Sequence, residues 1–206
     1  MTVKPPVIKN LGKTDYEPVW QAMKQFTADR DVETQDEFWL TEHFPVYTQG
    51  LNGRQEHLLS TSNIPVVQVD RGGQATYHGP GQLIVYCLLD LNRLGLGIRQ
   101  LVTDIELAII SLLKSYKVDA YAKREAPGVY VGQAKIAALG LRIRKGYCYH
   151  GLSLNLDMDL RPFSGINPCG FKGLEVTQLS DFDKHFSTEQ LSKQLCSHLI
   201  STIGYE

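Results

Sequence analysis

The sequence predicts a mixed α/β (α+β) fold, with a mixed sheet flanked by helices in a single domain over residues 1–206. Apolar side chains recur at helical spacing in three segments, and the chain between those segments shows apolar runs and alternation typical of strands. No internal repeat, low-complexity stretch or Ser/Gly linker divides the 206 residues, which are enough for one substantial domain.

Three helices are predicted. The first covers residues 15–30, with Asp15 placed as its N-cap and four apolar side chains on one face: Val19, Trp20, Met23 and Phe26. The second covers residues 98–116 and has the clearest apolar face: Ile98, Leu101, Val102, Ile105, Ile109, Leu112, Leu113 and Tyr116. The third covers about 188–203, with apolar residues four apart: Leu191, Leu195, Leu199 and Ile203.

The remaining segments are predicted to be strands and loops. Residues 37–48 are expected to be extended, and residues 65–70 to form a short strand. The run LIVYCLLDL, residues 83–91, predicts a buried strand because both of its faces are apolar. Residues 118–156 are expected to be mostly β, and the Pro- and Gly-rich residues 160–173 to form a loop.

Composition excludes several classes of function. The formal net charge is −1, which gives no support to whole-surface binding of nucleic acid or membrane. The N-terminus has no apolar signal segment, and no run approaches the roughly 18 apolar residues that cross a bilayer. The four cysteines have no spacing typical of a metal site. We therefore expect a cytoplasmic protein with reduced thiols, no metal, and neither a nucleic-acid nor a membrane partner.

Cys169 differs from the other cysteines. Cys87 and Cys196 lie in strongly apolar segments and are predicted to be core residues, and a structural role is favoured for Cys148 in its strand. Cys169 stands in INPCG, within a loop that offers little apolar packing. It is a candidate nucleophile, although an inert loop cysteine is the alternative.

A nucleophilic cysteine needs a basic or cationic neighbour that favours the thiolate. The candidates are His78, His150 and a lysine. Lys135 stands in QAKIAALG, where a long cation among small and apolar residues is out of place. The alternative is that Lys135 lies on the solvent face of an edge strand.

Four motifs in order resemble one family, the lipoyl(octanoyl) transferases, also called octanoyl-acyl-carrier-protein:protein N-octanoyltransferases. They are RGGQATYHGPGQ, AKIAALGLRIRKG, YHGLSLNL and INPCG, and with the chain between them they span about residues 65–180. The resemblance implies a fold like that of the biotin and lipoate protein ligases.

The resemblance also implies a reaction that needs no cofactor. The octanoyl group would pass from octanoyl-acyl carrier protein to a specific lysine of a lipoyl domain, in 2-oxoacid dehydrogenase complexes or the glycine cleavage H protein. Cys169 matches the family's nucleophile, and Lys135 matches the lysine that activates it. The residues that match its substrate-binding stretches are Arg71, Gly72, Gly73, Gln74, Ala75, Thr76, Tyr77, His78, Ala138, Leu139, Gly140, Gly151, Leu152 and Ser153.

The glycine-rich stretch RGGQATYHGPGQ is expected to wall an acyl pocket, with backbone amides near the thioester carbonyl. The expected lining side chains are Tyr77, Ala138, Leu139 and Leu152. His78 could orient the loop or the substrate, or it could be a structural residue that closes the loop.

Two other functions stay open at this point. An ATP-dependent lipoate or biotin protein ligase would share the fold and would need no cysteine nucleophile. A non-catalytic module that binds acyl groups or carrier protein would tolerate replacement of Cys169.

Both implied protein substrates are typically acidic, so basic side chains are candidates for docking them, with ordinary solvated surface charge as the alternative. The candidates are Arg142, Arg144, Lys145, Lys123, Arg124 and Lys172.

Overall fold

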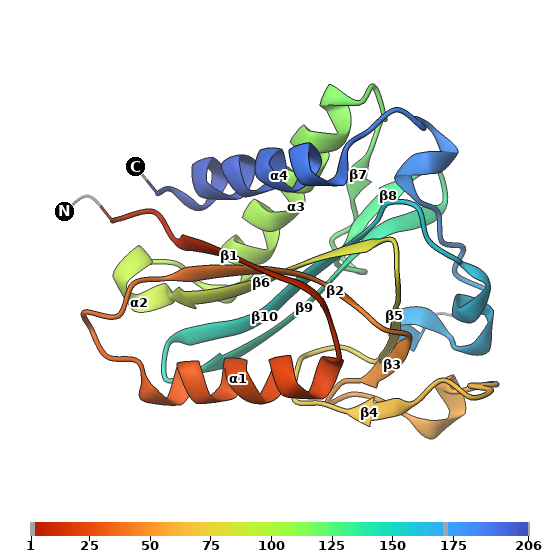
Figure 1. Cartoon of the computed structure of the whole chain (residues 1–206), viewed down its shortest axis with the longest axis horizontal. Coiled ribbons are helices and arrows are strands. Elements are labelled where there is room, and N and C mark those ends of the chain that lie inside the picture. Colours follow the sequence, from red (N-terminus) through yellow and green to blue (C-terminus); the bar gives the residue numbers. More distant parts are fainter. Residues whose placement is uncertain (1–2, 171–172, 206) are drawn as a thin grey trace.

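A seven-stranded mixed sheet forms the centre of the protein (Figure 1). The structure, a computed structural model, describes residues 3–170 and 173–205, and the side chain of Cys169 lies outside this description. In spatial order the strands are β1 (Val7–Thr14), β2 (Glu37–His43), β6 (Gln82–Asp90), β10 (Tyr147–Asn155), β9 (Ala134–Arg144), β8 (Val129–Val131) and β7 (Tyr121–Ala122). Only β1 and β2 pair in parallel within it, so the sheet is mixed as predicted.

A small second sheet carries the glycine-rich stretch. Its order is β4 (Val66–Gln68), β3 (Val46–Gln49) and β5 (Ala75–His78), with β4 parallel and β5 antiparallel to β3. The residues between β4 and β5, which include Gly72 and Gly73, therefore connect two strands of this small sheet, and the turn after β5 leads directly into β6 of the large one.

Helices cover both faces of the large sheet. The helix α1 (Tyr16–Asp29) lies on one face, and α3 (Ile98–Ser115) and α4 (Thr188–Ile203) lie together on the other (Figure 1). The remaining helical segments are short: α2 (Leu91–Leu94), η1 (Gln55–His57), η2 (Arg161–Gly165), η3 (Pro168–Gly170) and η4 (Leu179–Asp181). None of the helices in the described part of the chain is long and apolar enough to cross a membrane.

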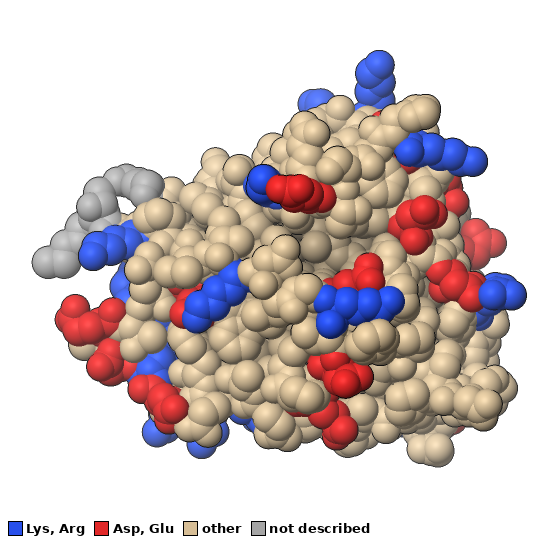
Figure 2. Space-filling view, in the orientation of Figure 1, with Lys and Arg blue, Asp and Glu red and all other residues tan. Residues whose placement is uncertain are grey.

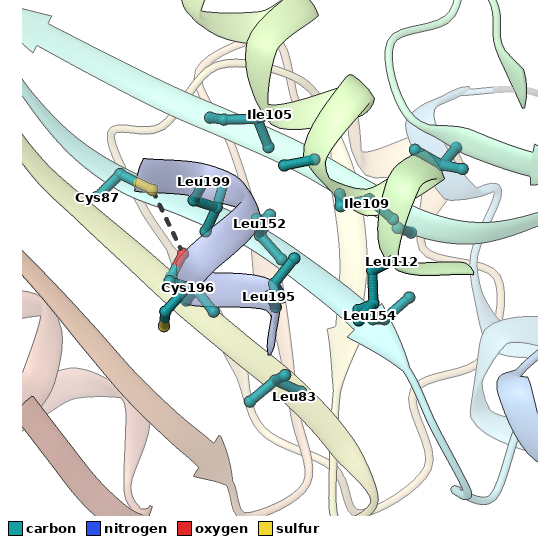
Figure 3. Close-up of a cluster of buried hydrophobic side chains, with 14 of the residues drawn as sticks. Leu83, Cys87, Ile105, Ile109, Leu112, Leu152, Leu154, Leu195, Cys196 and Leu199 are labelled. Carbon is teal, nitrogen blue, oxygen red and sulfur yellow. Dashed lines mark hydrogen bonds between the residues drawn. The ribbon is translucent and has the colours of Figure 1, made fainter. Parts of the chain in front are cut away.

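The strand β6 lies inside the sheet, between β2 and β10, and is buried along its whole length because both faces are covered. Alternate side chains point to opposite faces of a strand. One set, which includes Val85 and Cys87, packs against α3 and α4, and the other, which includes Ile84 and Leu88, packs on the α1 side. Figure 3 shows Cys87 of β6 and Cys196 of α4 among the leucines of the core on the α3–α4 side.

Most sequence predictions of local structure are confirmed. The three helices, the buried strand and the β-rich 118–156 region are present, and Cys87, Cys148 and Cys196 are core residues. Asp15 stands at the N-cap of α1 but makes no capping hydrogen bond, and Ile98 is 50% exposed at the first turn of α3. Residues 160–173 were predicted to form a loop, but they contain the short helices η2 and η3.

A buried carboxylate joins distant ends of these elements. The side chain of Asp36 accepts bonds from Arg30 after α1 at 2.6 Å, from Arg93 in α2 at 2.6 Å, and from the hydroxyl of Tyr205 near the C-terminus at 2.6 Å. It also accepts from the backbone of Asp90 at 2.8 Å. Since a buried carboxylate is costly without partners, these four donors fix the mutual position of the segments that carry them.

The helix α3 offers a test of this packing. We expect Leu112→Ala to lower the free energy of unfolding by about 2–5 kcal/mol, because Leu112 is fully buried against the sheet and α4. The same change at Leu107, which is 48% exposed on the same helix, should cost less than about 1 kcal/mol. Urea denaturation of both variants measures the difference, and equal losses would show that α3 is not packed as described.

Candidate active site

A narrow cavity lies on the α1 side of the sheet, beneath the glycine-rich stretch. Its volume is about 50 Å³. Most of the predicted substrate-binding residues line it: Arg71, Gly73, Gln74, Ala75, Thr76, His78, Ala138, Leu139, Gly140, Gly151, Leu152 and Ser153. Three separate segments of the sequence thus meet around one space.

Two of the expected residues do not line the cavity. Gly72 instead donates its backbone N–H to Leu141 O at 3.0 Å, which fixes the glycine-rich stretch on β9. Tyr77 was expected in the acyl pocket, but its ring packs 5.5 Å from the rings of both Tyr47 and Phe163. Alternation along β5 points its side chain away from Thr76 and His78, which line the cavity.

Four residues line the cavity that were not predicted as binding residues: Tyr16, Ile84, Tyr86 and His150. The sequence predicted His150 only as a candidate basic neighbour of Cys169. Tyr16, Ile84 and Tyr86 belong to a helix and a strand whose apolar pattern predicts burial, and nothing local distinguishes them from ordinary core residues.

Two strand positions beside the cavity are occupied by glycine because neighbouring groups leave no room for a side chain. A Cβ at Gly140 would lie 2.9 Å from Cδ of Arg71, and a Cβ at Gly151 would lie 2.0 Å from Val85 O. Neither distance is compatible with a side chain, so the two glycines, paired across β9 and β10, are required by close approach.

Arg71 and His78 fix the glycine-rich stretch from both ends. The guanidinium of Arg71 donates to Thr48 O at 2.7 Å and to its Oγ1 at 2.8 Å. His78 Nδ1 lies 2.8 Å from Oε1 of Gln82, across the turn after β5, and its ring stacks on Tyr16 at 5.8 Å. The bond to Gln82 fits the loop-closing alternative for His78, while the ring also lines the cavity.

Lys135 is buried, with only 4% of its surface exposed. Its strand β9 lies between β8 and β10, so the solvent-face alternative on an edge strand is wrong. The ammonium donates to Pro127 O at 3.0 Å and lies 5.1 Å from the ring centroid of Tyr130. A Cβ at Gly128, which has a φ of +138°, would lie only 3.1 Å from Nζ, so glycine makes room for this cation.

Glu106 is the acidic group near Lys135. Its Oε1 accepts the backbone N–H of Gly128 at 2.7 Å. Burial raises the pKa of Glu106, and the bond from Gly128 and the charge of Lys135 oppose that rise. The charge of Lys135 thus favours the ionised form of Glu106.

The loop that carries Cys169 is anchored on both sides. Before Cys169, Asn167 donates its backbone N–H to His57 O at 2.9 Å. After it, Lys135 N donates to Glu175 O at 2.8 Å and Thr177 N donates to Lys135 O at 3.0 Å. The backbone of Cys169 lies in η3, and its side chain lies outside the described residues.

Gln74 connects this loop with the cavity. It lines the cavity, and its side-chain amide lies so close to Gly170 that a Cβ there would be 2.3 Å from Nε2. Gly170 also has a φ of +79°, which favours glycine. The residue directly after Cys169 therefore contacts the wall of the cavity.

The described residues contain no group of three or more His, Cys, Asp or Glu side chains that could hold a metal ion.

The fold is that of the lipoate and biotin protein ligases. A lipoate protein ligase from Thermoplasma acidophilum superposes with a TM-score of 0.77 at 16% identity, over 99% of this chain and 85% of that one. A biotin protein ligase from Aquifex aeolicus, in complex with biotin and ATP, gives a TM-score of 0.60 at 12% identity over 96% and 70%. These likenesses confirm the predicted fold.

The sequence narrows this class. Residues 15–200 match the family model described as the lipoyl protein ligase A/B catalytic domain. The chain is 56% identical over 199 residues to an octanoyltransferase from Dechloromonas aromatica, covering 97% of each. It is 57% identical over 200 residues to an octanoyltransferase from Vibrio cholerae, covering 97% of this chain and 92% of that one. The chain belongs to the lipoyl protein ligase A/B family and, within it, to the octanoyltransferases.

The buried His78 predicts a dependence of stability on pH. Burial, and then the nearby His43, lowers the pKa of His78 from 6.5 to about 3. Between these values the unfolded chain binds a proton that the folded chain does not, so stability falls as the pH falls. At pH 5 the loss from this group is about 2 kcal/mol relative to pH 7.

We expect His78→Gln to lose less stability than the wild type between pH 7 and pH 5, as measured by urea denaturation at both values. His185→Gln, at an exposed position, is the control and should follow the wild type. A wild-type slope retained in His78→Gln would contradict the assignment.

Proposed function

We propose that this protein transfers the octanoyl group from octanoyl-acyl carrier protein to a specific lysine of lipoyl domains, the first step of endogenous protein lipoylation. In this proposal one catalytic domain performs the reaction through a thioester on Cys169, with Lys135 as its acid and base. The observation that carries the proposal is Lys135: a buried cation is costly, and its backbone is bonded to the segment that follows Cys169.

The first half-reaction forms the acyl-enzyme. The thiolate of Cys169, favoured by the Lys135 ammonium, attacks the thioester carbonyl of octanoyl-acyl carrier protein. The tetrahedral intermediate expels the thiolate of the carrier's pantetheine, which takes a proton from Lys135. Exchange between a thiol and a thioester is close to isoenergetic, so no ATP is needed for this step.

The second half-reaction forms the amide. The lysine of the lipoyl domain, as a neutral amine, attacks the carbonyl of the acyl-enzyme. Its nitrogen loses one proton to the neutral Lys135, and Cys169 leaves as a thiolate, which restores the starting ion pair. The amide is more stable than the thioester that it replaces, so this step draws the reaction forward.

The cavity is the proposed acyl site. Ala138, Leu139 and Leu152 contribute apolar lining, and the glycine-rich stretch contributes backbone amides. An amide aimed at the developing oxyanion lowers the barrier by about 3 kcal/mol. Gln74, which contacts both the cavity and Gly170, is suited to position the thioester end.

The ATP-dependent ligase alternative rests on the fold alone, since the ligase structures are only 12–16% identical to this chain. The octanoyltransferase relatives are 56–57% identical over nearly its whole length, which favours transfer without ATP. The non-catalytic alternative offers no reason for a buried lysine beside the loop of Cys169.

The proposed protein partners are acyl carrier protein as donor, and lipoyl domains of 2-oxoacid dehydrogenase complexes and the glycine cleavage H protein as acceptors. Charges of both signs are interspersed over the face in Figure 2, so docking would depend on a local patch. Among the basic candidates, Arg144 and Lys145 are exposed at the turn between β9 and β10. Arg142 is partly buried and hydrogen-bonded to Tyr149, and Lys172 lies outside the described residues.

The direct functional test is transfer from octanoyl-acyl carrier protein to a lipoyl domain without ATP. We expect Cys169→Ala to abolish transfer and Lys135→Ala to slow it at least about a hundredfold, since a positioned acid and base contributes that much. Cys196→Ala removes a core cysteine from α4 and should keep transfer within about threefold, because it changes packing alone. Transfer by Cys169→Ala, or transfer that starts only when ATP is added, would reject the proposal.

The docking hypothesis has its own test. Arg144→Glu combined with Lys145→Glu should raise the KM for octanoyl-acyl carrier protein about tenfold through like-charge repulsion, with kcat on a small octanoyl thioester unchanged. Steady-state kinetics with both donors measures this. An unchanged KM for the carrier would mean that these two residues are ordinary solvated charges.

A further inference from the structure

His150 has an unusual backbone conformation for a residue inside a strand. Cys148, Leu152 and Leu154 of β10 face the α3–α4 core, and alternation predicts the same for His150. Its φ of +62° lies in the left-handed region, which is unfavourable for a residue with a Cβ. The ring instead lies on the opposite side of the sheet, where it stacks on Tyr149 at 5.1 Å and lines the cavity.

Asp70 holds the ring in that place. Its Oδ1 lies 3.0 Å from His150 Nε2 and accepts the indole N–H of Trp20 at 2.8 Å, and its Oδ2 accepts the hydroxyl of Tyr149. Burial raises the pKa of Asp70, but these three hydrogen bonds outweigh it and hold the pKa far below its ordinary value. An ionised carboxylate only accepts hydrogen bonds, so the proton of His150 stays on Nε2.

The other ring nitrogen, Nδ1, is therefore an acceptor. Nδ1 of His150 is buried, and it has no hydrogen-bond partner within residues 3–170 and 173–205. Only 1% of the surface of His150 is exposed. A residue that lines a cavity and keeps a strained backbone conformation indicates a functional role for its side chain.

Strand register places His150 at the end of the cavity remote from Lys135. His150 pairs with Leu141, whereas Ser153 pairs with Ala138, nearer to Lys135 along β9. From Ala138 to Leu141 is about 10 Å at roughly 3.4 Å per residue. An extended octanoyl chain is about 9 Å long, at roughly 1.3 Å per carbon for C–C bonds of about 1.5 Å. A chain attached near the Lys135 end therefore ends beside His150.

We propose that His150, fixed by Asp70, is the end wall of the acyl cavity and limits the chain to about eight carbons. This inference rests on the proposed function, which places the thioester at Cys169. Longer chains meet the ring itself, which the bond to Asp70 and the packing around it hold in place. The wall therefore disfavours long chains by its shape.

Two substitutions open the wall to different degrees. Glycine accepts the left-handed backbone, and His150→Gly opens the wall and removes the acceptor. Asparagine also tolerates this backbone, and His150→Asn opens part of the space but keeps a polar group. Lys117→Gly is the control, because it replaces another left-handed residue, with a φ of +59°, at an exposed position beyond the cavity lining.

Competition between octanoyl-, decanoyl- and dodecanoyl-acyl carrier protein for transfer to a lipoyl domain measures the preference of each variant for acyl chain length. We expect His150→Gly to raise the kcat/KM ratio of decanoyl and dodecanoyl over octanoyl at least about tenfold. His150→Asn should give a smaller rise, and Lys117→Gly should leave the ratio unchanged. Thermal unfolding of each variant identifies any loss of fold.

Calorimetric binding of octanoate and dodecanoate to the same variants repeats the comparison without catalysis. Wild-type discrimination that persists in His150→Gly, or a wild type that binds both acids equally, would overturn the end wall. If the wild type transfers no octanoyl group, the proposed function fails, and the binding data still decide whether His150 limits chain length.

Discussion

The backbone of Lys135 is the point on which the proposed site depends. Its N–H and C=O, on one edge of β9, are bonded to Glu175 and Thr177, the segment that returns from the Cys169 loop. Its side chain is the buried cation proposed to activate that cysteine. Because one residue supplies both the anchor and the charge, a shift of β9 moves the two together. The loop before Cys169 is also held by apolar packing, because Phe163 and Ile166 are buried in one cluster with Tyr77.

The sheet beneath the site is rigid because both of its faces are packed. The strand β6 is buried throughout, with α3 and α4 on one side and α1 on the other. Gly140 and Gly151, paired across β9 and β10, let the Arg71 side chain and the Val85 carbonyl approach closely beside the cavity. The substrate-binding stretches are thus rich in glycine because the chain closes tightly around a narrow space, and no phosphate is needed to explain them.

Features that depend on neighbouring residues could be predicted from the sequence, whereas features that depend on distant segments could not. Three helices and one buried strand could be predicted because the spacing of apolar residues along the chain is enough to indicate them. They are the helices at 15–30, 98–116 and 188–203 and the strand at 83–91. The three core cysteines were predictable for the same reason. The side-chain direction of Tyr77 was not, because it depends on where β5 begins relative to its partner β3. Nor was the burial of Lys135, which depends on β8 and the segment after Cys169 covering β9 on both sides.

The catalytic assignment of Cys169 and Lys135 came from the family resemblance, and the structure adds the environment of Lys135. The contacts of Asp36 and the left-handed conformation of His150 had no local signal at all. The bonds from Asp90, Arg93 and Tyr205 to Asp36 join positions at least 54 residues apart. The conformation of His150 depends on its bond to Asp70, 80 residues away, and on strain that the surrounding packing imposes.

Intact-protein mass spectrometry after mixing the protein with octanoyl-acyl carrier protein, without ATP, tests the central claim most directly. The account predicts a single octanoyl adduct that is labile to hydroxylamine, maps to Cys169, and disappears when a lipoyl domain is added. Octanoylation of the lipoyl domain with no adduct at Cys169 at any time, including under rapid quenching, would contradict it.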